Sequence, residues 1–230
     1  MIRRSLLLLA LGLHISTTHA DEARTRIALA GDSTVTDKAG WGAAFAKLLG
    51  PSAECLNFAA GGQSSKSFRD TGNWKKVIDS KPAYILIQFG HNDMPGKGPK
   101  RETDPSTTYP QNLTRFIEEA RAIGAKPILV TSLARRTFDN GKIRGELKPW
   151  ADAATKVATE QHAPLIDLFA RSVELHKRLG VAGSDTFNPP GKDAKTTDRT
   201  HLNAHGAEVI ATIIAEEIRK VAPDLAKLLK

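Results

Sequence analysis

The sequence predicts one α/β domain in which a parallel sheet lies between two layers of helices. Short apolar runs without clean alternation recur along the chain, as expected for strands buried on both faces. Segments with apolar residues at helical spacing lie between them. The links are mostly short, which favours right-handed crossovers between parallel strands. A chain of 230 residues without an internal repeat suits one domain.

Three strands are predicted in the first half of the chain, and each ends at a glycine. They span residues 26–30, 55–59 and 83–89 and stop at Gly31, Gly61 and Gly90. The third is the strongest, because it is rich in β-branched and aromatic residues and has no polar face. A helix is predicted over residues 41–49, where Gly50-Pro51 ends the apolar pattern.

The second half continues the alternation. Strands are predicted over residues 126–132 and 165–168, and helices over residues 109–123, 149–162 and 203–221. Two long irregular segments, residues 94–108 and 183–200, interrupt the pattern. Loops of this length are either walls or lids of a functional site or merely surface loops, and both interpretations stay open.

Short motifs at three places offer the groups of a serine esterase. Gly31-Asp-Ser-Thr34 supplies a hydroxyl, and Asp198-Arg-Thr-His201 supplies an imidazole with a carboxylate three residues away. Serine alkoxide chemistry needs a nucleophile, a base that takes its proton and an acid that orients the base. Gly90-His-Asn-Asp93 adds an amide able to steady an oxyanion.

Each motif is weak alone. A serine in such a turn is most often a helix cap or a turn former, and Asp-x-x-His is usually a surface turn. Their joint placement is more informative, because loops that follow parallel strands open on one edge of the sheet, where α/β proteins bind ligands. We therefore expect Ser33, Gly62 and Asn92 to meet at that edge.

Four sequence blocks resemble those of the SGNH, or GDSL-like, hydrolases. They are Gly31-Asp-Ser-Thr-Val35, residues 57–68, Gln88-Phe-Gly-His-Asn-Asp93 and Asp198-x-x-His201. Within that superfamily the chain is most similar to the rhamnogalacturonan acetylesterases, and the resemblance runs from Ile27 to the terminal helix. The Gly-x-Ser-x-Gly elbow of α/β-hydrolases is absent.

The resemblance implies a fold and a set of roles. The sheet would have the flavodoxin-like order 2-1-3-4-5, with the site above its first and third strands. Ser33 would be the nucleophile, His201 the base and Asp198 its orienting partner. The oxyanion hole would comprise the backbone amides of Ser33 and Gly62 and the side-chain amide of Asn92.

Gln63, Arg135 and Arg136 are candidate substrate-binding residues. The two arginines follow the strand predicted over residues 126–132 and are expected at the same rim. There they would either bind uronate carboxylates or form structural ion pairs with a neighbouring acid. His91 is expected to shape the loop of Asn92 rather than to act in the chemistry.

The first twenty residues have the features of a secretory signal peptide. Arg3 and Arg4 precede an apolar stretch over residues 6–13, and small residues precede Asp21. We expect cleavage after Ala20, which would leave residues 21–230 as an exported hydrolase domain, periplasmic or secreted, monomeric and without a membrane anchor. A lone cysteine forms no internal disulfide, so Cys55 is expected to be a small core residue.

A net charge of +8 favours anionic partners. Nucleic acid is not expected, because the basic residues are spread along the chain without aromatic interleaving or a recognisable binding module. An acidic polysaccharide outside the cell fits both charge and export. No cofactor is expected, and no metal site can be assembled from these residues.

The leading interpretation is a serine esterase that removes O-acetyl groups from an extracellular plant-type polysaccharide. The favoured substrate is acetylated rhamnogalacturonan or pectin. One alternative is an SGNH esterase acting on acetyl xylan, or on a lipid or thioester, although residues 94–108 are too polar for an acyl groove. A remote alternative is a non-catalytic protein that binds carbohydrate or, by fold analogy alone, a nucleotide. The intact set of Ser, Asn, Asp and His argues against it.

Overall fold

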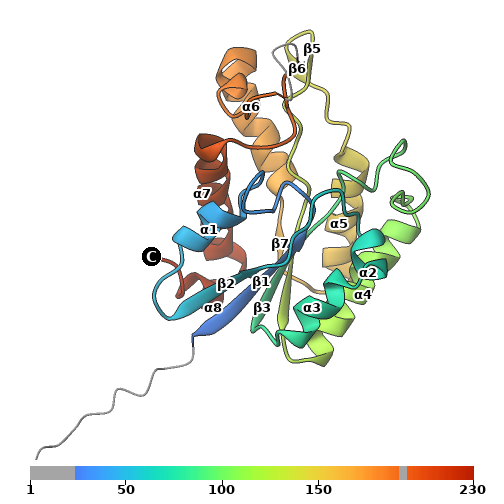
Figure 1. Cartoon of the computed structure of the whole chain (residues 1–230), viewed down its shortest axis with the longest axis vertical. Helices are drawn as coiled ribbons and strands as arrows, with labels where there is room; N and C mark the ends of the chain where they lie inside the picture. The colour runs from blue at the N-terminus through green and yellow to red at the C-terminus, as the bar shows by residue number, and fades with distance from the viewer. Residues whose placement is uncertain (1–23, 192–195) are drawn as a thin grey trace, which may run out of the picture.

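The structure is a computed structural model that describes residues 24–191 and 196–230. Five parallel strands form its main sheet, in the order β2-β1-β3-β4-β7 (Figure 1). The strands are β1 (Thr25–Gly31), β2 (Ala53–Asn57), β3 (Tyr84–Gln88), β4 (Lys126–Val130) and β7 (Leu165–Ile166). Counted within this sheet alone, the order is 2-1-3-4-5, so the predicted topology is confirmed. The predicted signal peptide and its cleavage site lie outside the described residues.

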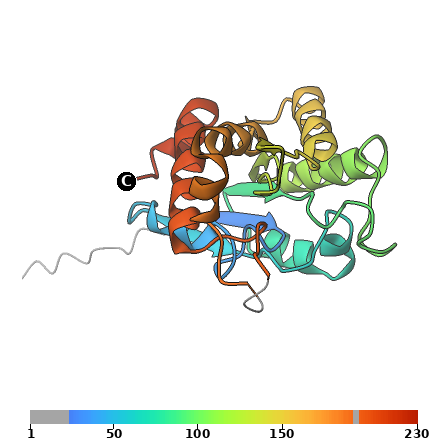
Figure 2. The ribbon, with the colours of Figure 1, turned by 90° about the horizontal axis from the view of Figure 1, so that it is seen from above.

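Helices cover both faces of the sheet, as Figure 2 shows from above. They are α1 (Gly42–Lys47), α2 (Ser67–Asp70), α3 (Asn73–Asp79), α4 (Thr108–Ala122), α5 (Lys148–Glu160), α6 (Leu168–Asp185), α7 (Ala204–Val221) and α8 (Pro223–Ala226). One core lies between the sheet and α1, α7 and α8, and the other lies between the sheet and α2 to α5. The three predicted layers are therefore present.

The central strand β3 explains why its sequence lacks alternation. Tyr84 and Leu86 point into the core beneath α1 and α7, whereas Ile85 and Ile87 point into the core beneath α3, α4 and α5. Because both faces are covered, all four side chains are buried. Burial of such side chains is the dominant favourable contribution to the stability of a fold of this kind.

Most predicted elements lie within two residues of the observed ones. The second strand is the one displaced at both ends, because it occupies Ala53–Asn57 rather than residues 55–59, two residues earlier. Two backbone hydrogen bonds, from Phe58 N–H to Leu29 O at 2.9 Å and from Ala60 N–H to Gly31 O at 3.0 Å, continue past its end before the chain turns away. Cys55 is half-buried beside the core rather than fully inside it.

Several elements were not predicted. α6 contains Gly180 with φ 63° and ψ −170°, which is not helical, and this kink breaks the periodic pattern. α6 also includes the first residues of the segment predicted to be irregular. A small antiparallel ribbon joins β5 (Phe138–Asp139) to β6 (Lys142–Ile143). Across the two described ranges, no helix is long and apolar enough to cross a membrane.

Candidate active site

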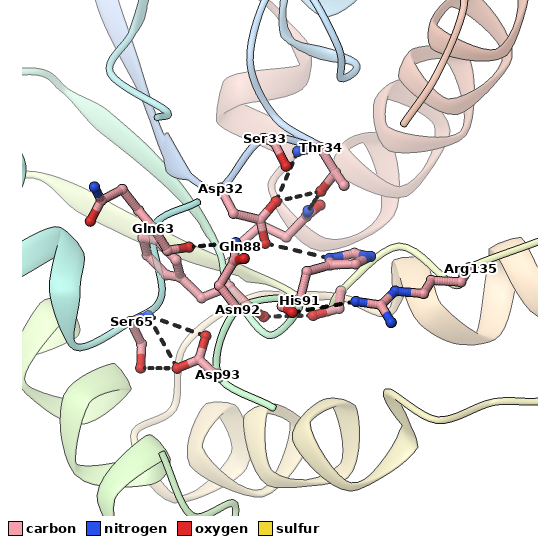
Figure 3. A network of polar contacts seen from close by, with 12 residues as sticks. Asp32, Ser33, Thr34, Gln63, Ser65, Gln88, His91, Asn92, Asp93 and Arg135 are labelled. Atoms are coloured by element: carbon pink, nitrogen blue, oxygen red, sulfur yellow. Dashed lines mark hydrogen bonds and ion pairs between the residues drawn. The ribbon is translucent and has the colours of Figure 1, made fainter. Parts of the chain in front are cut away.

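Three loops leave the carboxyl ends of β2, β1 and β3 and meet at one edge of the sheet. Gly31 at the end of β1 pairs with Gln88 at the end of β3, so the loops that follow start level with each other. The loop after β2 comes close to the nucleophile candidate, because a Cβ added at Gly61 would lie 3.9 Å from Ser33 Cβ. Asn92 reaches the same place from the loop after β3 (Figure 3).

Ser33, His201 and Asp198 form one hydrogen-bonded chain. His201 Nε2 lies 2.8 Å from Ser33 Oγ, and His201 Nδ1 lies 2.7 Å from Asp198 Oδ2. Asp198 Oδ1 accepts hydrogen bonds from the backbone N–H groups of Thr200 and His201, both at 3.0 Å. Partial burial acts to raise the pKa of Asp198, but the hydrogen bonds from His201 and Thr200 hold it below its ordinary value. An ionised carboxylate therefore faces an imidazole that is placed to take the hydroxyl proton.

A buried arginine holds the loop of Asp198 and His201 in place. Arg136 donates hydrogen bonds to the backbone oxygens of both residues and, through Nε, to Asn188 Oδ1 at 2.6 Å. Burial lowers the pKa of Arg136 to about 10, against the raising effect of Asp198 and Asp185, so the guanidinium stays protonated at neutral pH. From the sequence, Arg136 is expected at the exposed rim of the site. The structure places it inside, 0% exposed, because its planar fork satisfies buried carbonyls.

Replacing Arg136 by methionine is expected to lower the free energy of unfolding by roughly 2–4 kcal/mol, because backbone oxygens lose their donors in a buried site. kcat should fall as well, since the loop that positions His201 loses its anchor. Denaturant unfolding and aryl acetate hydrolysis measure the two effects. The matched control is Arg178→Met on α6, where the side chain is exposed. Equal unfolding free energies for the two variants would contradict this anchoring role.

A buried polar chain fixes the turn behind Ser33. Asp32 Oδ1 accepts hydrogen bonds from Thr34 N–H at 2.9 Å and from Thr34 Oγ1 at 2.7 Å. Thr34 Oγ1 in turn accepts from Gln88 Nε2 at 2.7 Å, and Gln88 Oε1 accepts from Trp41 Nε1 at 3.0 Å. These hydrogen bonds connect β1, β3 and the start of α1, so the turn that carries the Ser33 hydroxyl is held by the sheet itself.

The other carboxylate oxygen of Asp32 faces His91. Its Oδ2 lies 3.4 Å from His91 Nδ1, and the two side chains are 0% and 3% exposed. Burial acts to raise the pKa of Asp32, but the electrostatic interaction with His91 and the hydrogen bonds of Thr34 bring it below its ordinary value. This pair connects the turn of Ser33 to the loop of Asn92, in keeping with the shaping role expected of His91.

Three N–H groups beside Ser33 are free to bind an oxyanion. Within the described residues, the backbone N–H groups of Ser33 and Gly62 donate no hydrogen bond. Asn92 Nδ2 donates one hydrogen to Gln63 O at 3.0 Å, which leaves its second N–H unused. Gly62 has φ 75°, a conformation that glycine adopts without strain.

Gln63 contributes to this site through its backbone. Its carbonyl oxygen holds Asn92, whereas its side chain extends away from Ser33 (Figure 3). The side-chain Oε1 lies 3.4 Å from Thr71 Oγ1. The structure thus shows that the Gln63 backbone holds the Asn92 side chain, and a contact of the Gln63 side chain with substrate stays a prediction.

Asp93 joins three loops beneath the site. It is buried and accepts hydrogen bonds from Ser65 N–H at 3.1 Å, Ser65 Oγ at 2.6 Å and Thr103 Oγ1 at 2.9 Å. Burial raises the pKa of Asp93 to about 7, although the hydrogen bonds of Ser65 and Thr103 act to lower it. The carboxyl therefore titrates near neutral pH while it connects the loop after β2 to the segment that precedes α4.

Stability is expected to fall as pH rises from 5 to 8. The folded protein holds the Asp93 proton up to about pH 7, whereas the unfolded chain releases it near pH 4, so this stabilisation is present at low pH and is lost as pH rises. The loss should be on the order of 2 kcal/mol. Denaturant unfolding of the protein and of Asp93→Asn at both pH values tests this, with the exposed Asp104→Asn as control. The same pH dependence in protein and Asp93→Asn would contradict the assignment.

Comparison with known proteins agrees with this fold. Residues 26–209 match the GDSL-like lipase/acylhydrolase family, and the chain belongs to that family. It is a carboxylic ester hydrolase. The chain is 37% identical over 213 residues to the rhamnogalacturonan acetylesterase RhgT of Bacillus subtilis, covering 85% of this chain and 90% of that protein.

Solved structures share the fold. The Bacillus subtilis protein YXIM superimposes with a TM-score of 0.72 at 26% identity, and the match covers 86% of this chain and 56% of that one. This chain therefore spans little more than half of that structure. The acetylxylan esterase Axe2 of Geobacillus stearothermophilus gives a TM-score of 0.66 at 19% identity, with coverage of 85% and 94%. At that identity the likeness concerns the fold alone.

Proposed function

We propose that this ester hydrolase is a carbohydrate acetylesterase that removes O-acetyl groups from a pectic polysaccharide, with acetylated rhamnogalacturonan as its first candidate substrate. The observation that carries the proposal is the hydrogen-bonded chain Ser33–His201–Asp198 at the carboxyl edge of the sheet. The name of the 37% identical relative supports the choice of substrate. Export also belongs to the proposal, with residues 1–20 removed as a signal peptide and residues 21–230 forming a monomeric hydrolase domain.

In the first half of the reaction, His201 takes the proton of Ser33 as Oγ attacks the acetyl carbonyl carbon. The negative charge that develops on the carbonyl oxygen would be met by the N–H groups of Ser33, Gly62 and Asn92. When the tetrahedral intermediate collapses, the C–O bond to the sugar breaks and His201 returns the proton to the leaving hydroxyl. The acetyl group is then bonded to Ser33 Oγ.

In the second half, water replaces the sugar. His201 takes a proton from the water as its oxygen attacks the acetyl-enzyme, and the same three N–H groups would bind the second oxyanion. Collapse releases acetate, and the proton on His201 returns to Ser33 Oγ. Asp198 stays ionised throughout and keeps Nδ1–H of His201 directed toward itself.

Acetate release from three substrates tests the proposal. Acetylated rhamnogalacturonan, acetylated xylan and a short aryl acetate are compared, each with the protein and with Ser33→Ala. Release that depends on Ser33 and is fastest from rhamnogalacturonan is expected. Faster release from xylan would favour the second carbohydrate candidate. Cleavage of the aryl ester alone would retain the mechanism and contradict the polysaccharide substrate.

A lipid substrate finds less support in the residues around Ser33. Arg101, a basic residue of the segment before α4, approaches Gly62, and Met94, the apolar residue that begins this segment, is partly buried against the core. An acyl chain would need an exposed apolar groove beside the nucleophile. The large hydrophobic residues with the most exposure in the described part of the chain lie elsewhere, at Ile123 on the end of α4 and at Leu179 and Val181 on α6.

A further inference from the structure

Two cationic side chains, Arg101 and Arg135, border the site on the side of Gly62 and His91, and Lys97 lies one turn of chain before Arg101. Arg101 lies over the loop after β2 that bears Gly62, because a Cβ added at Gly62 would lie 3.7 Å from Arg101 Nη1. Arg101 Nε donates a hydrogen bond to Lys97 O at 2.8 Å, so these two residues share one turn of chain. Arg135 extends its guanidinium toward the loop of His91 and Asn92 (Figure 3), with Nη2 3.4 Å from His91 O.

These cations have no acidic partner in the two described ranges of the chain. Within the described residues, no carboxylate lies within 4.0 Å of Lys97, Arg101 or Arg135, whereas Arg69 and Arg171 elsewhere on the surface each pair with glutamate. Burial lowers the pKa of Lys97, and the charges of Arg135 and Arg101 lower it further. The three charges are thus close enough to repel one another. An anion placed among them would relieve that repulsion.

The positions of the cations are fixed by the scaffold of the site. Thr103 N–H and Oγ1 bind Asp93, which anchors one end of the segment that bears Lys97 and Arg101. Lys66 Nζ donates a hydrogen bond to Pro99 O at 2.8 Å and holds the middle of the segment against the loop after β2. Arg135 Nε is buried and has no hydrogen-bond partner among the described residues. Such preorganised donors lose little freedom when an anion binds.

We infer that Lys97, Arg101 and Arg135 form a carboxylate subsite, which binds a uronate residue of the chain next to the sugar that bears the acetyl group. The inference rests on the proposed function and adds the part of the substrate that is recognised beyond the ester. Guanidinium groups suit this ligand, because their planar donor pairs match the two oxygens of a carboxylate. Because the subsite lies beside Gly62, the uronate that it binds would be a sugar next to the acetylated one in the polysaccharide chain.

Inhibition by a product-like oligosaccharide tests the subsite without turnover of a polysaccharide. The probe is an unacetylated rhamnogalacturonan oligosaccharide, and its control is the same oligosaccharide with every carboxylate reduced to an alcohol. Each competes with aryl acetate hydrolysis by the protein. We expect the acidic oligosaccharide to inhibit about 10-fold more tightly than the reduced one, and this preference should weaken as ionic strength rises.

Variants assign the preference to these residues. Arg101→Gln should bring the two inhibition constants to within about 2-fold of each other. Arg101→Lys keeps the positive charge but lacks the planar pair of guanidinium donors, so it should retain part of the difference. Arg178→Gln, an exposed arginine on α6, should retain all of it. Equal inhibition by the two oligosaccharides, no inhibition by either, or an unchanged preference in Arg101→Gln would overturn the subsite.

The two proposals fail in different ways. If the protein releases no acetate from acetylated rhamnogalacturonan but prefers the acidic inhibitor in an Arg101-dependent manner, the proposed function is wrong and the subsite stands. If Ser33-dependent acetate release occurs without any preference for the acidic inhibitor, the function stands and the subsite is wrong.

Discussion

Replacing Ser33 by alanine is expected to reduce kcat/KM for acetyl esters by at least about 10⁴-fold. Ser33 Oγ lies 2.8 Å from His201 Nε2, and alanine offers no atom to form the acetyl-enzyme. The remaining rate would come from substrate binding and the oxyanion donors acting on water. The exposed Ser52, at the amino end of β2, provides the matched control as Ser52→Ala.

The same experiment extends to His201. His201→Ala should cost about as much as Ser33→Ala, and the double variant should be no slower than either, because the two groups act as one unit. Kinetics on an aryl acetate measure all three variants. Two results would show that another group attacks the ester. One is a Ser33→Ala variant that keeps more than about 1% of the parental kcat, and the other is a double variant whose fold loss in kcat is the product of the two single losses.

Replacing Asn92 by alanine is expected to lower kcat by about 10²- to 10³-fold with little change in KM. Its unused N–H lies at the edge where Ser33 and Gly62 also present free donors, and the negative charge that it would bind exists only in the transition state. Steady-state kinetics on the aryl acetate separate the two parameters. A rise in KM at constant kcat would instead assign Asn92 to ground-state binding.

Thermal unfolding of Asn92→Ala is needed beside the kinetics, because Asn92 also donates a hydrogen bond to Gln63 O. Losing that bond should cost about 1 kcal/mol of stability, which leaves the protein folded under assay conditions. A variant that is folded and slow therefore reports on catalysis rather than on structure.

The strands β1, β3 and β4 could be predicted because they are buried on both faces over most of their length. Ile85, Leu86 and Ile87 are apolar without alternation, and this pattern has few other structural explanations. α6 gave no such pattern, since Gly180 breaks its helical geometry and many of its side chains face solvent. The ribbon of β5 and β6 has strands of two residues, too short for any period to show.

The side chains that meet in the Ser33–His201–Asp198 chain could also be predicted, because a hydroxyl, an imidazole and a carboxylate are recognisable by type. Their supports could not. Arg136 and Arg135 are adjacent arginines after the same strand, yet one is buried under backbone carbonyls and the other faces the site. Residue type does not reveal which way a side chain points in a segment without period. Lys97 and Arg101 likewise look like ordinary basic residues of a polar loop.

The pairing of Ser33 with His201 also has a consequence for biogenesis. The two residues are 168 positions apart, so Ser33 is synthesised long before His201. On the proposed mechanism, a nascent chain that has not yet released residue 201 from the ribosome should be inert as an esterase, whatever strands it has already formed. During refolding in vitro, the return of hydrolysis should mark the formation of this long-range contact, and it should follow the gain of helical circular dichroism in time.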